Sequence, residues 1–249
     1  MPPSYPPMIL LFTDFGLSGP YTGQMKAVLA QQAPGVPAID LFADAPAFDP
    51  QLSAYLLAAY APAFPAGSVF LSVVDPGVGT DRRPVMVEAD GRWFVGPDNG
   101  LFAMTARRAT SLNAWKIDWI PDRLSASFHG RDLFAPVAAS LATGRTVARS
   151  LLDPTAIDRP DWPDELPRIV YVDVYGNAMT GMRASALPAD AVLTAGGARI
   201  ARARTFGAVG PGEPLWYENS NGLAEIAVNR GRADRVLGLK VGDPLTVEP

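Results

Sequence analysis

The first 75 residues alternate between short apolar runs and segments in which apolar residues recur at helical spacing. The runs Met8–Phe12, Pro37–Phe42 and Ser68–Val74 predict buried strands. Between them, Tyr21–Gln32 and Pro50–Tyr60 have the spacing of helices, and the proline that starts the second segment is typical of a first helical turn. Strands that alternate with helices in this order predict a mostly parallel α/β sheet with right-handed crossovers.

After residue 80 the polar and apolar positions predict a hairpin, another strand and a late helix. Pro84–Glu88 and Arg92–Val95 flank an Asp-Gly pair, which indicates a β-hairpin. Leu112–Ile117 is predicted to be another strand. Arg131–Ala142 has the composition of a helix, but Pro136 delays its start or kinks it.

The pattern changes at residues 153–167, where four prolines interrupt any periodicity. We interpret this segment as a linker between an N-terminal α/β domain, residues 1–152, and a C-terminal domain, residues 168–249. Beyond the linker, short β-like segments are separated by Gly and Pro turns, and one helical pattern remains; these are Arg168–Val174, Ala178–Gly181, Ala191–Thr194, Leu215–Glu218 and the helical Ala233–Leu237. They predict a small C-terminal β-barrel domain.

Composition narrows the classes of function. Of 249 residues, 48% are hydrophobic and 18% are charged, which is typical of a globular protein, and a net charge of −4 argues against nucleic acid as a partner. The chain has no cysteine and one histidine, which excludes disulfides, thiolate metal sites and a His-rich zinc site. The first residues lack the features of a signal peptide, and no apolar run approaches the roughly 18 residues of a membrane span, so we expect a cytoplasmic protein.

Acidic or polar residues follow three of the predicted strands. Asp14 comes after the first strand, Asp75 after the third, and Asp98-Asn99 after the hairpin. In open α/β sheets ligands bind beyond the carboxyl ends of the strands, where a carboxylate accepts hydrogen bonds from groups such as a ribose diol. Each aspartate taken alone fits ordinary turn closure better.

The loop that begins at Asp75 is rich in glycine but has neither the Lys-Ser/Thr ending of a P-loop nor a dinucleotide fingerprint. Asp75 and Arg82 are seven residues apart and can pair across the loop; an arginine beside a carboxylate favours its charged form and fixes its direction. His129 is the only histidine, and Gly130 leaves space beside it. A lone histidine is more often structural than catalytic, so the residues alone leave its role open.

In the C-terminal half, Asp173, Tyr175 and Asn177 bring an acceptor, an aromatic ring and an amide together within five residues. The segments 218–222 and 225–229 add further acidic and amide groups. An aromatic face with an amide suits a purine base, while Asp and Ser suit an amino-acid head group. Ordinary turn chemistry also explains these residues and is favoured when they are considered by themselves.

Six ordered motifs nevertheless resemble those of one family, the S-adenosylmethionine (SAM) hydrolases or SAM hydroxide adenosyltransferases, relatives of the SAM-dependent fluorinase and chlorinase. The motifs are Thr13–Gly16 with Gly23–Lys26, Val74–Thr80 with Arg82, Gly96–Gly100, Phe128–Asp132, Tyr175–Asn177, and Asn219–Gly222 with Glu225–Gly231. They span nearly the whole chain, which makes chance agreement implausible.

The resemblance implies a homotrimer in which SAM lies between the N-terminal domain of one subunit and the C-terminal domain of its neighbour. It also implies hydrolysis of SAM to adenosine and L-methionine by attack of water at C5′ of the ribose, with SAM as the substrate and with neither a cofactor nor a metal. Asp75, Arg82 and His129 would be the catalytic, water-handling residues. The implied substrate-binding residues are Asp14 at the ribose; Asn177 and the backbone near Val228 and Arg230 at adenine; Tyr175 or Phe206 stacking on the base; Asp173 and Ser220 at the methionine head group; and Glu225.

The same positions bear on the alternatives. Halogenases of this group resemble the hydrolases but have Tyr where this chain has Asp75 and His129, so this chain has the hydrolase combination. An ionised Asp75 would also repel a halide while accepting a hydrogen bond from water. The chain departs from the family pattern at Gly19-Pro20, at Phe42–Asp44 and at Thr180-Gly181. These departures leave a non-catalytic SAM-binding or adenosine-binding protein as a further alternative.

Overall fold

The computed structural model describes residues 6–248, and the chain divides into two compact units after Arg159. This boundary falls inside the predicted linker, residues 153–167. The first five residues, which carry most of the N-terminal segment considered for a signal peptide, lie outside the described part. Among residues 6–248, no helix is long and apolar enough to cross a membrane.

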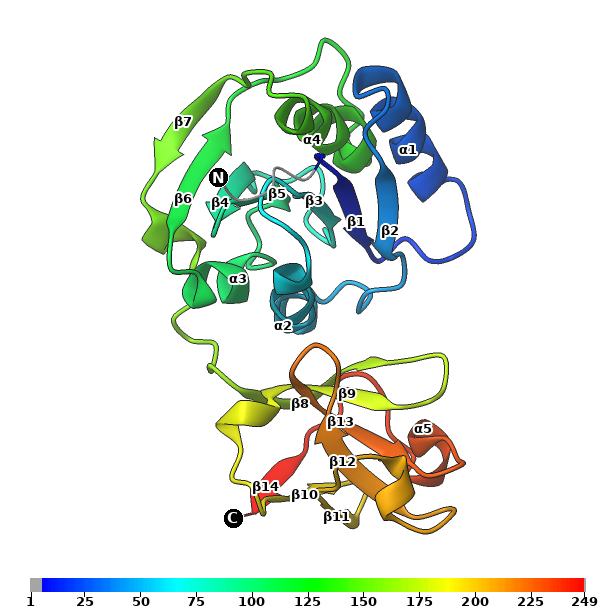
Figure 1. The fold of residues 1–249 in the computed structure, drawn as a ribbon. Coiled ribbons are helices and arrows are strands. Elements are labelled where there is room, and N and C mark those ends of the chain that lie inside the picture. The colour runs from blue at the N-terminus through cyan, green and yellow to red at the C-terminus, as the bar shows by residue number, and fades with distance from the viewer. Residues whose placement is uncertain (1–5, 249) are drawn as a thin grey trace. The chain divides into compact units, whose positions relative to one another are not determined.

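The first unit is built on a mixed sheet that has seven strands within residues 6–159, in the order β2-β1-β3-β5-β4-β6-β7 (Figure 1). Its strands are β1 (Ile9–Thr13), β2 (Ala38–Phe42), β3 (Val69–Val73), β4 (Pro84–Ala89), β5 (Arg92–Pro97), β6 (Leu112–Ile117) and β7 (Arg149–Leu152). The first four strands in the sheet order pair in parallel, which confirms the predicted α/β pattern there. The predicted hairpin forms β4 and β5, and its antiparallel pairing continues to β6 and β7.

Helices cover both faces of this sheet (Figure 1). The helices α1 (Tyr21–Gln32) and α4 (Ala135–Ala142) lie on one face, and α2 (Pro50–Tyr60) and α3 (Ala103–Arg108) on the other. The predicted bounds of α1 and α2 are confirmed. Asp49 caps α2 because its carboxylate accepts a hydrogen bond of 2.9 Å from the Leu52 N–H. The six residues of α3 are too few to show a helical period, so the sequence did not reveal this helix.

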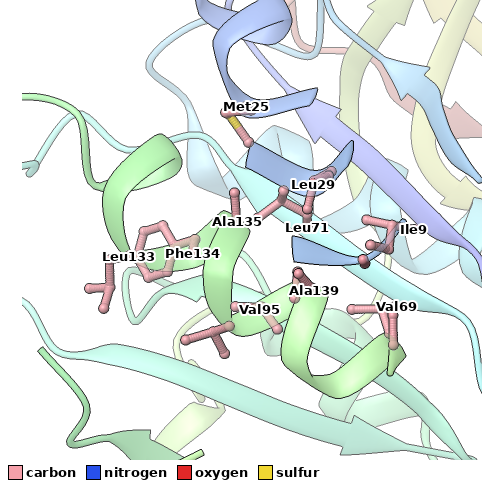
Figure 2. Packing of buried hydrophobic residues seen from close by; sticks show 14 of the residues in the cluster. Ile9, Met25, Leu29, Val69, Leu71, Val95, Leu133, Phe134, Ala135 and Ala139 are labelled. Carbon is pink, nitrogen blue, oxygen red and sulfur yellow. The ribbon is translucent and has the colours of Figure 1, made fainter. Parts of the chain in front are cut away.

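The core of the first unit explains why its central strands were readable from the sequence. All five residues of β1 are buried, because the strand is covered by helices on both sides. Ile9 and Leu11 pack with Met25, Leu29 and Phe134 of the helical layer (Figure 2). A strand covered on both faces reads as a continuous apolar run.

The late helix is divided into two parts, as Pro136 led us to expect. A π-helical turn over Gly130–Phe134 precedes α4, and the Ala135 N–H donates to the Gly130 carbonyl. Pro136 then occupies the second position of α4 and, having no N–H, donates no hydrogen bond to the turn before it. Gly130 is buried, and a Cβ atom there would lie 3.2 Å from the Met25 Sδ atom. The close packing fixes the start of this turn, which His129 immediately precedes.

The second unit contains two antiparallel sheets within residues 160–248, of orders β12-β13-β9-β8 and β11-β10-β14. Its elements are β8 (Leu166–Val172), β9 (Ala178–Arg183), β10 (Val192–Ala195), β11 (Ala198–Ala201), β12 (Pro214–Glu218), β13 (Leu223–Val228), α5 (Ala233–Val236) and β14 (Thr246–Glu248). This confirms a separate β-rich C-terminal region. A closed barrel stays a prediction.

One buried strand of the second unit differs from the sequence interpretation. The segment from residue 225 to 229 suggested polar turn chemistry, yet β13 is a strand with all six residues buried. Glu225 in its middle breaks the apolar run and hides the strand pattern. Tertiary hydrogen bonds to the carboxylate offset its burial, and the sequence pattern cannot show them.

Gly96 in β5 provides a test of close packing between neighbouring strands. A Cβ atom at this position would lie 2.1 Å from the backbone oxygen of Ser72 in β3. We expect Gly96→Ala to lower the free energy of unfolding by roughly 1–3 kcal/mol, because backbone cannot move aside easily. As the matched control, a Cβ atom at Gly23 in α1 would meet no atom of residues 6–248 within 4 Å, so Gly23→Ala should raise stability by up to about 1 kcal/mol. Urea unfolding of both variants measures the difference, and equal stabilities would contradict it.

Candidate active site

The ends of two neighbouring strands bring Asp14 and Asp75 to the same edge of the sheet. Thr13 is the last residue of β1 and pairs with Val73, the last residue of β3, in parallel register. Both carboxylates therefore follow strands that end at the same level. They line one cavity, as expected for a ligand site beyond the carboxyl ends of parallel strands.

The cavity has a volume of about 330 Å³, at the lower end of the range for small-molecule sites. Its walls combine carboxylates, a histidine and several aromatic rings; the lining residues are Asp14, Phe15, Tyr21, Phe48, Val73, Asp75, Val78, Ser127, Phe128, His129 and Gly130. The rings of Phe15, Tyr21 and Phe128 contact one another with centroids 5.4–5.9 Å apart. Two carboxylates among aromatic faces suit an organic cation.

Asp75 and Arg82 form a nearly buried ion pair. The Arg82 Nε donates to Oδ1 of Asp75 at 2.8 Å and to Oδ2 at 3.0 Å, and Nη2 also donates to Oδ2. Their side chains are only 5% and 9% exposed, respectively. The guanidinium also lies 5.2 Å from the centre of the Phe134 ring. The pairing predicted across the glycine-rich loop is present.

His129 joins this pair through the same guanidinium nitrogen. Nη2 of Arg82 lies 3.0 Å from Nδ1 of His129. Arginine has only donors, so Nδ1 accepts, and the hydrogen of the neutral ring lies on Nε2. Burial, followed by repulsion from Arg82, lowers the pKa of His129, although Asp75 and Asp132 act in the opposite direction. The site therefore holds a neutral histidine whose free edge is an N–H donor.

Asp14 is held by an unusual backbone conformation at Phe48. The Phe48 N–H donates to Oδ2 of Asp14 at 3.0 Å, and Phe48 has φ of 59°, which non-glycine residues rarely adopt. Burial raises the pKa of Asp14, and the nearby Asp75 charge adds to this effect. The sequence analysis missed Phe48 because no sequence pattern predicts a phenylalanine with a left-handed backbone conformation.

The other eight predicted substrate-binding residues lie in the second unit, where Asp173, Tyr175 and Asn177 form one turn. Oδ1 of Asp173 accepts from the Tyr175 N–H at 2.9 Å and from the Asn177 N–H at 2.8 Å, while Oδ2 accepts from the Asn177 amide at 3.2 Å. Tyr175 is 73% exposed. The carboxylate thus closes the turn, as the simpler interpretation expected, and the turn presents an aromatic ring.

Glu225 lies beneath this surface, with only 3% of the residue exposed. Its carboxylate accepts hydrogen bonds from the hydroxyl of Tyr217 and, at 2.9 Å, from the amide of Asn219. Burial raises the pKa of Glu225, and the hydrogen bonds from Tyr217, Asn219 and Asn177 oppose this effect. The structure thus places Glu225 inside the unit, as a partner of residues nearer the surface.

The remaining predicted contacts differ in exposure. Phe206 stacks at an angle on Tyr217, with ring centroids 5.2 Å apart. Ser220 and Arg230 are exposed, whereas Val228 is buried. Arg230 has φ of 57° and lies in a tight turn closed by the hydrogen bond from the Gly231 N–H to the Val228 carbonyl.

Asp98-Asn99, the pair that follows the predicted hairpin, lies outside the cavity that Asp14 and Asp75 line. Among the described residues that line the cavity, neither Asp98 nor Asn99 appears. Asp98 instead accepts a hydrogen bond from Arg83 at the end of the glycine-rich loop, and Asn99 donates one to the Val74 carbonyl at its start. Within residues 6–248, no three Asp, Glu or His side chains gather into a metal-binding group.

Comparisons with known proteins agree over nearly the full chain. Residues 9–150 match the family model described as the SAM hydroxide adenosyltransferase N-terminal domain, and residues 167–246 match the corresponding C-terminal domain. An (R)-S-adenosyl-L-methionine hydrolase from Thermus thermophilus is 42% identical over 263 residues, covering 95% of this chain and 98% of the relative. One from Salinispora tropica is 37% identical, covering 97% of each chain.

A solved structure agrees as well. The crystal structure of an uncharacterized conserved protein from Thermotoga maritima matches with a TM-score of 0.83 and 30% identity, over 97% of this chain and 100% of that one. Fluorinases match at lower identity; one from Actinoplanes sp. is 24% identical over 299 residues, covering 99% of each chain.

The contact between Arg82 and His129 makes a prediction that NMR can test on the only histidine. We expect His129 to titrate below the ordinary value of about 6.5 and to carry its hydrogen on Nε2 when neutral. In Arg82→Gln the pKa should rise, because the repelling guanidinium is gone while Asp75 remains. The exposed Arg145→Gln is the control and should change nothing. An unshifted pKa in Arg82→Gln would contradict the interaction.

Proposed function

The chain belongs to the SAM hydroxide adenosyltransferase family, and on this premise we propose that it hydrolyses SAM to adenosine and L-methionine. The observation that carries the proposal is the array of Asp75, Arg82 and His129, two of which open onto a cavity lined by aromatic rings. Such an array can hold one water molecule against a carbon atom of a bound cation.

The reaction balances without a further reactant. An oxygen lone pair of water forms a bond to C5′ of the ribose, and the C5′–S bond breaks so that its electron pair neutralises the sulfonium. The products are adenosine, methionine and one proton. Because the attacking water becomes a strongly acidic oxonium as the C–O bond forms, a carboxylate is a sufficient proton acceptor.

The contacts of Arg82 determine which of its two partners, Asp75 or His129, can accept the proton of the attacking water. It occupies Nδ1 of His129, so the Nε2–H of that ring can donate a hydrogen bond to the water but cannot take its proton. Asp75 retains lone pairs beyond those that Arg82 uses, and it would accept the proton. Positioning of this kind is worth up to about 7–11 kcal/mol in well-oriented systems.

The other cavity residues suit the substrate. Asp14 uses one oxygen to hold the Phe48 N–H and has acceptor capacity left for the ribose hydroxyls. The carboxylates of Asp14 and Asp75 attract a sulfonium cation, and the same charges disfavour a halide ion beside C5′. This distinction supports water rather than halide as the nucleophile.

We extend the proposal to a homotrimer in which the second unit of a neighbouring copy completes each active site. The reaction groups line a small cavity of the first unit, whereas the predicted contacts to adenine and methionine lie in the second unit. Tyr175 and Val174 are 73% and 79% exposed, respectively, which suits a turn that docks against another surface.

Product analysis tests the activity directly. Incubation with SAM and chloride in ¹⁸O-water should give adenosine that carries ¹⁸O at the 5′ position, together with methionine. Asp75→Asn and His129→Ala should lower kcat by at least about a hundredfold while SAM binding survives, because both side chains act on the water.

Calorimetric titration with SAM separates binding from turnover in these variants. Asn113→Asp, which alters an exposed residue of β6, controls for losses of activity during expression and purification and should keep full activity. Unlabelled adenosine, a 5′-chloro product or intact SAM with the wild-type protein would each contradict hydrolysis by water.

Complementation between variants tests the shared active site. His129→Ala and Asn177→Ala alter different units, so each homotrimer should be nearly inactive. When the two variants are co-expressed, each site has a one-half chance of an intact first unit and a one-half chance of an intact neighbouring second unit, so about a quarter of the wild-type activity should return. Activity no greater than that of the separate variants would contradict sites shared between copies.

A further inference from the structure

The turn Asp98-Asn99 holds both ends of the glycine-rich loop that carries Asp75 and Arg82. We propose that these two residues are positioning residues for catalysis: Asn99 fixes the start of the loop and Asp98 fixes its end. The inference rests on the proposed hydrolase function for its kinetic consequence, but the geometry is independent of that function. It assigns a role to the third strand-end signature, which does not line the cavity.

Asn99 holds the start of the loop through a backbone atom next to Asp75. Its Nδ2 donates to the Val74 carbonyl at 2.8 Å, and its Oδ1 accepts from the Leu101 N–H at 3.2 Å. The side-chain amide therefore bridges the end of β3 and the turn after β5. Because the Val74 carbonyl belongs to the peptide group that precedes Asp75, this bond sets the direction in which the Asp75 side chain leaves the backbone.

Asp98 holds the end of the loop through the neighbour of Arg82. Its Oδ2 accepts from Arg83 Nε at 2.9 Å and Nη2 at 2.5 Å, and its N–H donates to the Arg83 carbonyl at 2.9 Å. Oδ1 accepts from Arg159 at 3.2 Å. The Asp98 side chain is only 6% exposed, so two guanidinium groups balance a nearly buried carboxylate.

Between these two ends the loop is braced internally. The Val78 N–H donates to the Asp75 carbonyl at 3.2 Å, and the Thr80 hydroxyl donates to the Gly77 carbonyl at 2.7 Å. Gly79 lies so close to the chain opposite that a Cβ atom would be 2.6 Å from the Ala126 oxygen. A loop braced in this way moves as a unit, so its anchored ends determine where both of its functional side chains lie.

Both anchors are needed because Asp75, at the start of the loop, pairs with Arg82, near its end. Arg82 must reach Asp75 and His129 with one guanidinium, and the tolerance of such bonds is a few tenths of an ångström. A shift at either end would lengthen the contact to His129, which lies on a different element. The state of His129 therefore reports the position of the loop.

The test uses one substitution at two sites. Asn99→Asp keeps the acceptor for Leu101 but places an oxygen against the Val74 carbonyl, where the amide donated. The matched control, Asn113→Asp, has the same change of charge and likewise loses an amide donor, to Glu88 near the opposite end of β4. The measurements are kcat and KM for SAM, and the NMR titration of His129 in the unliganded protein.

We expect Asn99→Asp to lower kcat at least about tenfold, with KM changed less than about threefold, because the loop is displaced while the aromatic binding walls remain. The pKa of His129 should rise as Arg82 withdraws. Asn113→Asp should leave both quantities at their wild-type values. A folded Asn99→Asp with unchanged kcat and unchanged His129 titration would overturn the proposal, as would a change confined to KM.

Arg83→Gln provides the second arm, since the Arg83 side chain is 42% exposed and its loss is less disruptive than a change at Asp98. It should give the same pattern, and if Asn99→Asp fails to fold, the result with Arg83→Gln decides. Unchanged kcat and an unchanged His129 titration there would overturn the proposal. If the wild-type protein does not hydrolyse SAM, the proposed function fails, while the titration of His129 still shows whether the loop is anchored from this turn.

Discussion

The guanidinium of Arg82 is the group that holds two polar side chains of the cavity wall, Asp75 and His129, in place. It donates to both oxygens of Asp75 and to Nδ1 of His129, and it can do nothing but donate. One side chain thus fixes the direction of a carboxylate and the tautomer of an imidazole. The ion pair is nearly buried and the Phe134 ring lies against the guanidinium, so solvent screens the attraction less than it would at the surface.

The parallel register of the central strands brings these groups together. β1, β3 and β5 are neighbours, and the turns that follow their carboxyl ends have different tasks. The turns after β1 and β3 supply the carboxylates of the cavity, Asp14 and Asp75. Within residues 6–248, the turn after β5 supplies no residue to the cavity lining. Its Asp98 and Asn99 side chains form hydrogen bonds that hold the loop between β3 and β4. A rigid sheet thereby positions functional side chains on loops.

In the second unit, hydrogen bonds from neighbouring residues stabilise two of the acidic side chains. Glu225 is placed in a fully buried strand and is stabilised by hydrogen bonds from Tyr217 and Asn219. Its burial raises its pKa, so this carboxyl retains a proton more readily than an exposed glutamate. The Asp173 carboxylate closes the turn that displays Tyr175. In both cases an acidic residue predicted to bind substrate also holds its neighbours in place through hydrogen bonds.

The sequence by itself determined most strands and helices of the α/β half, with α3 and β7 as exceptions, because buried central strands leave continuous apolar runs and the longer helices keep their period. Its ordered motifs also determined the family, and with it the set of candidate residues. Only the tertiary structure decided which of these face the cavity, because the hydrogen bonds from Phe48 to Asp14 and from Asn99 to Val74 join residues 34 and 25 positions apart in the chain. It likewise decided the tautomer of His129, since that depends on a donor 47 residues away.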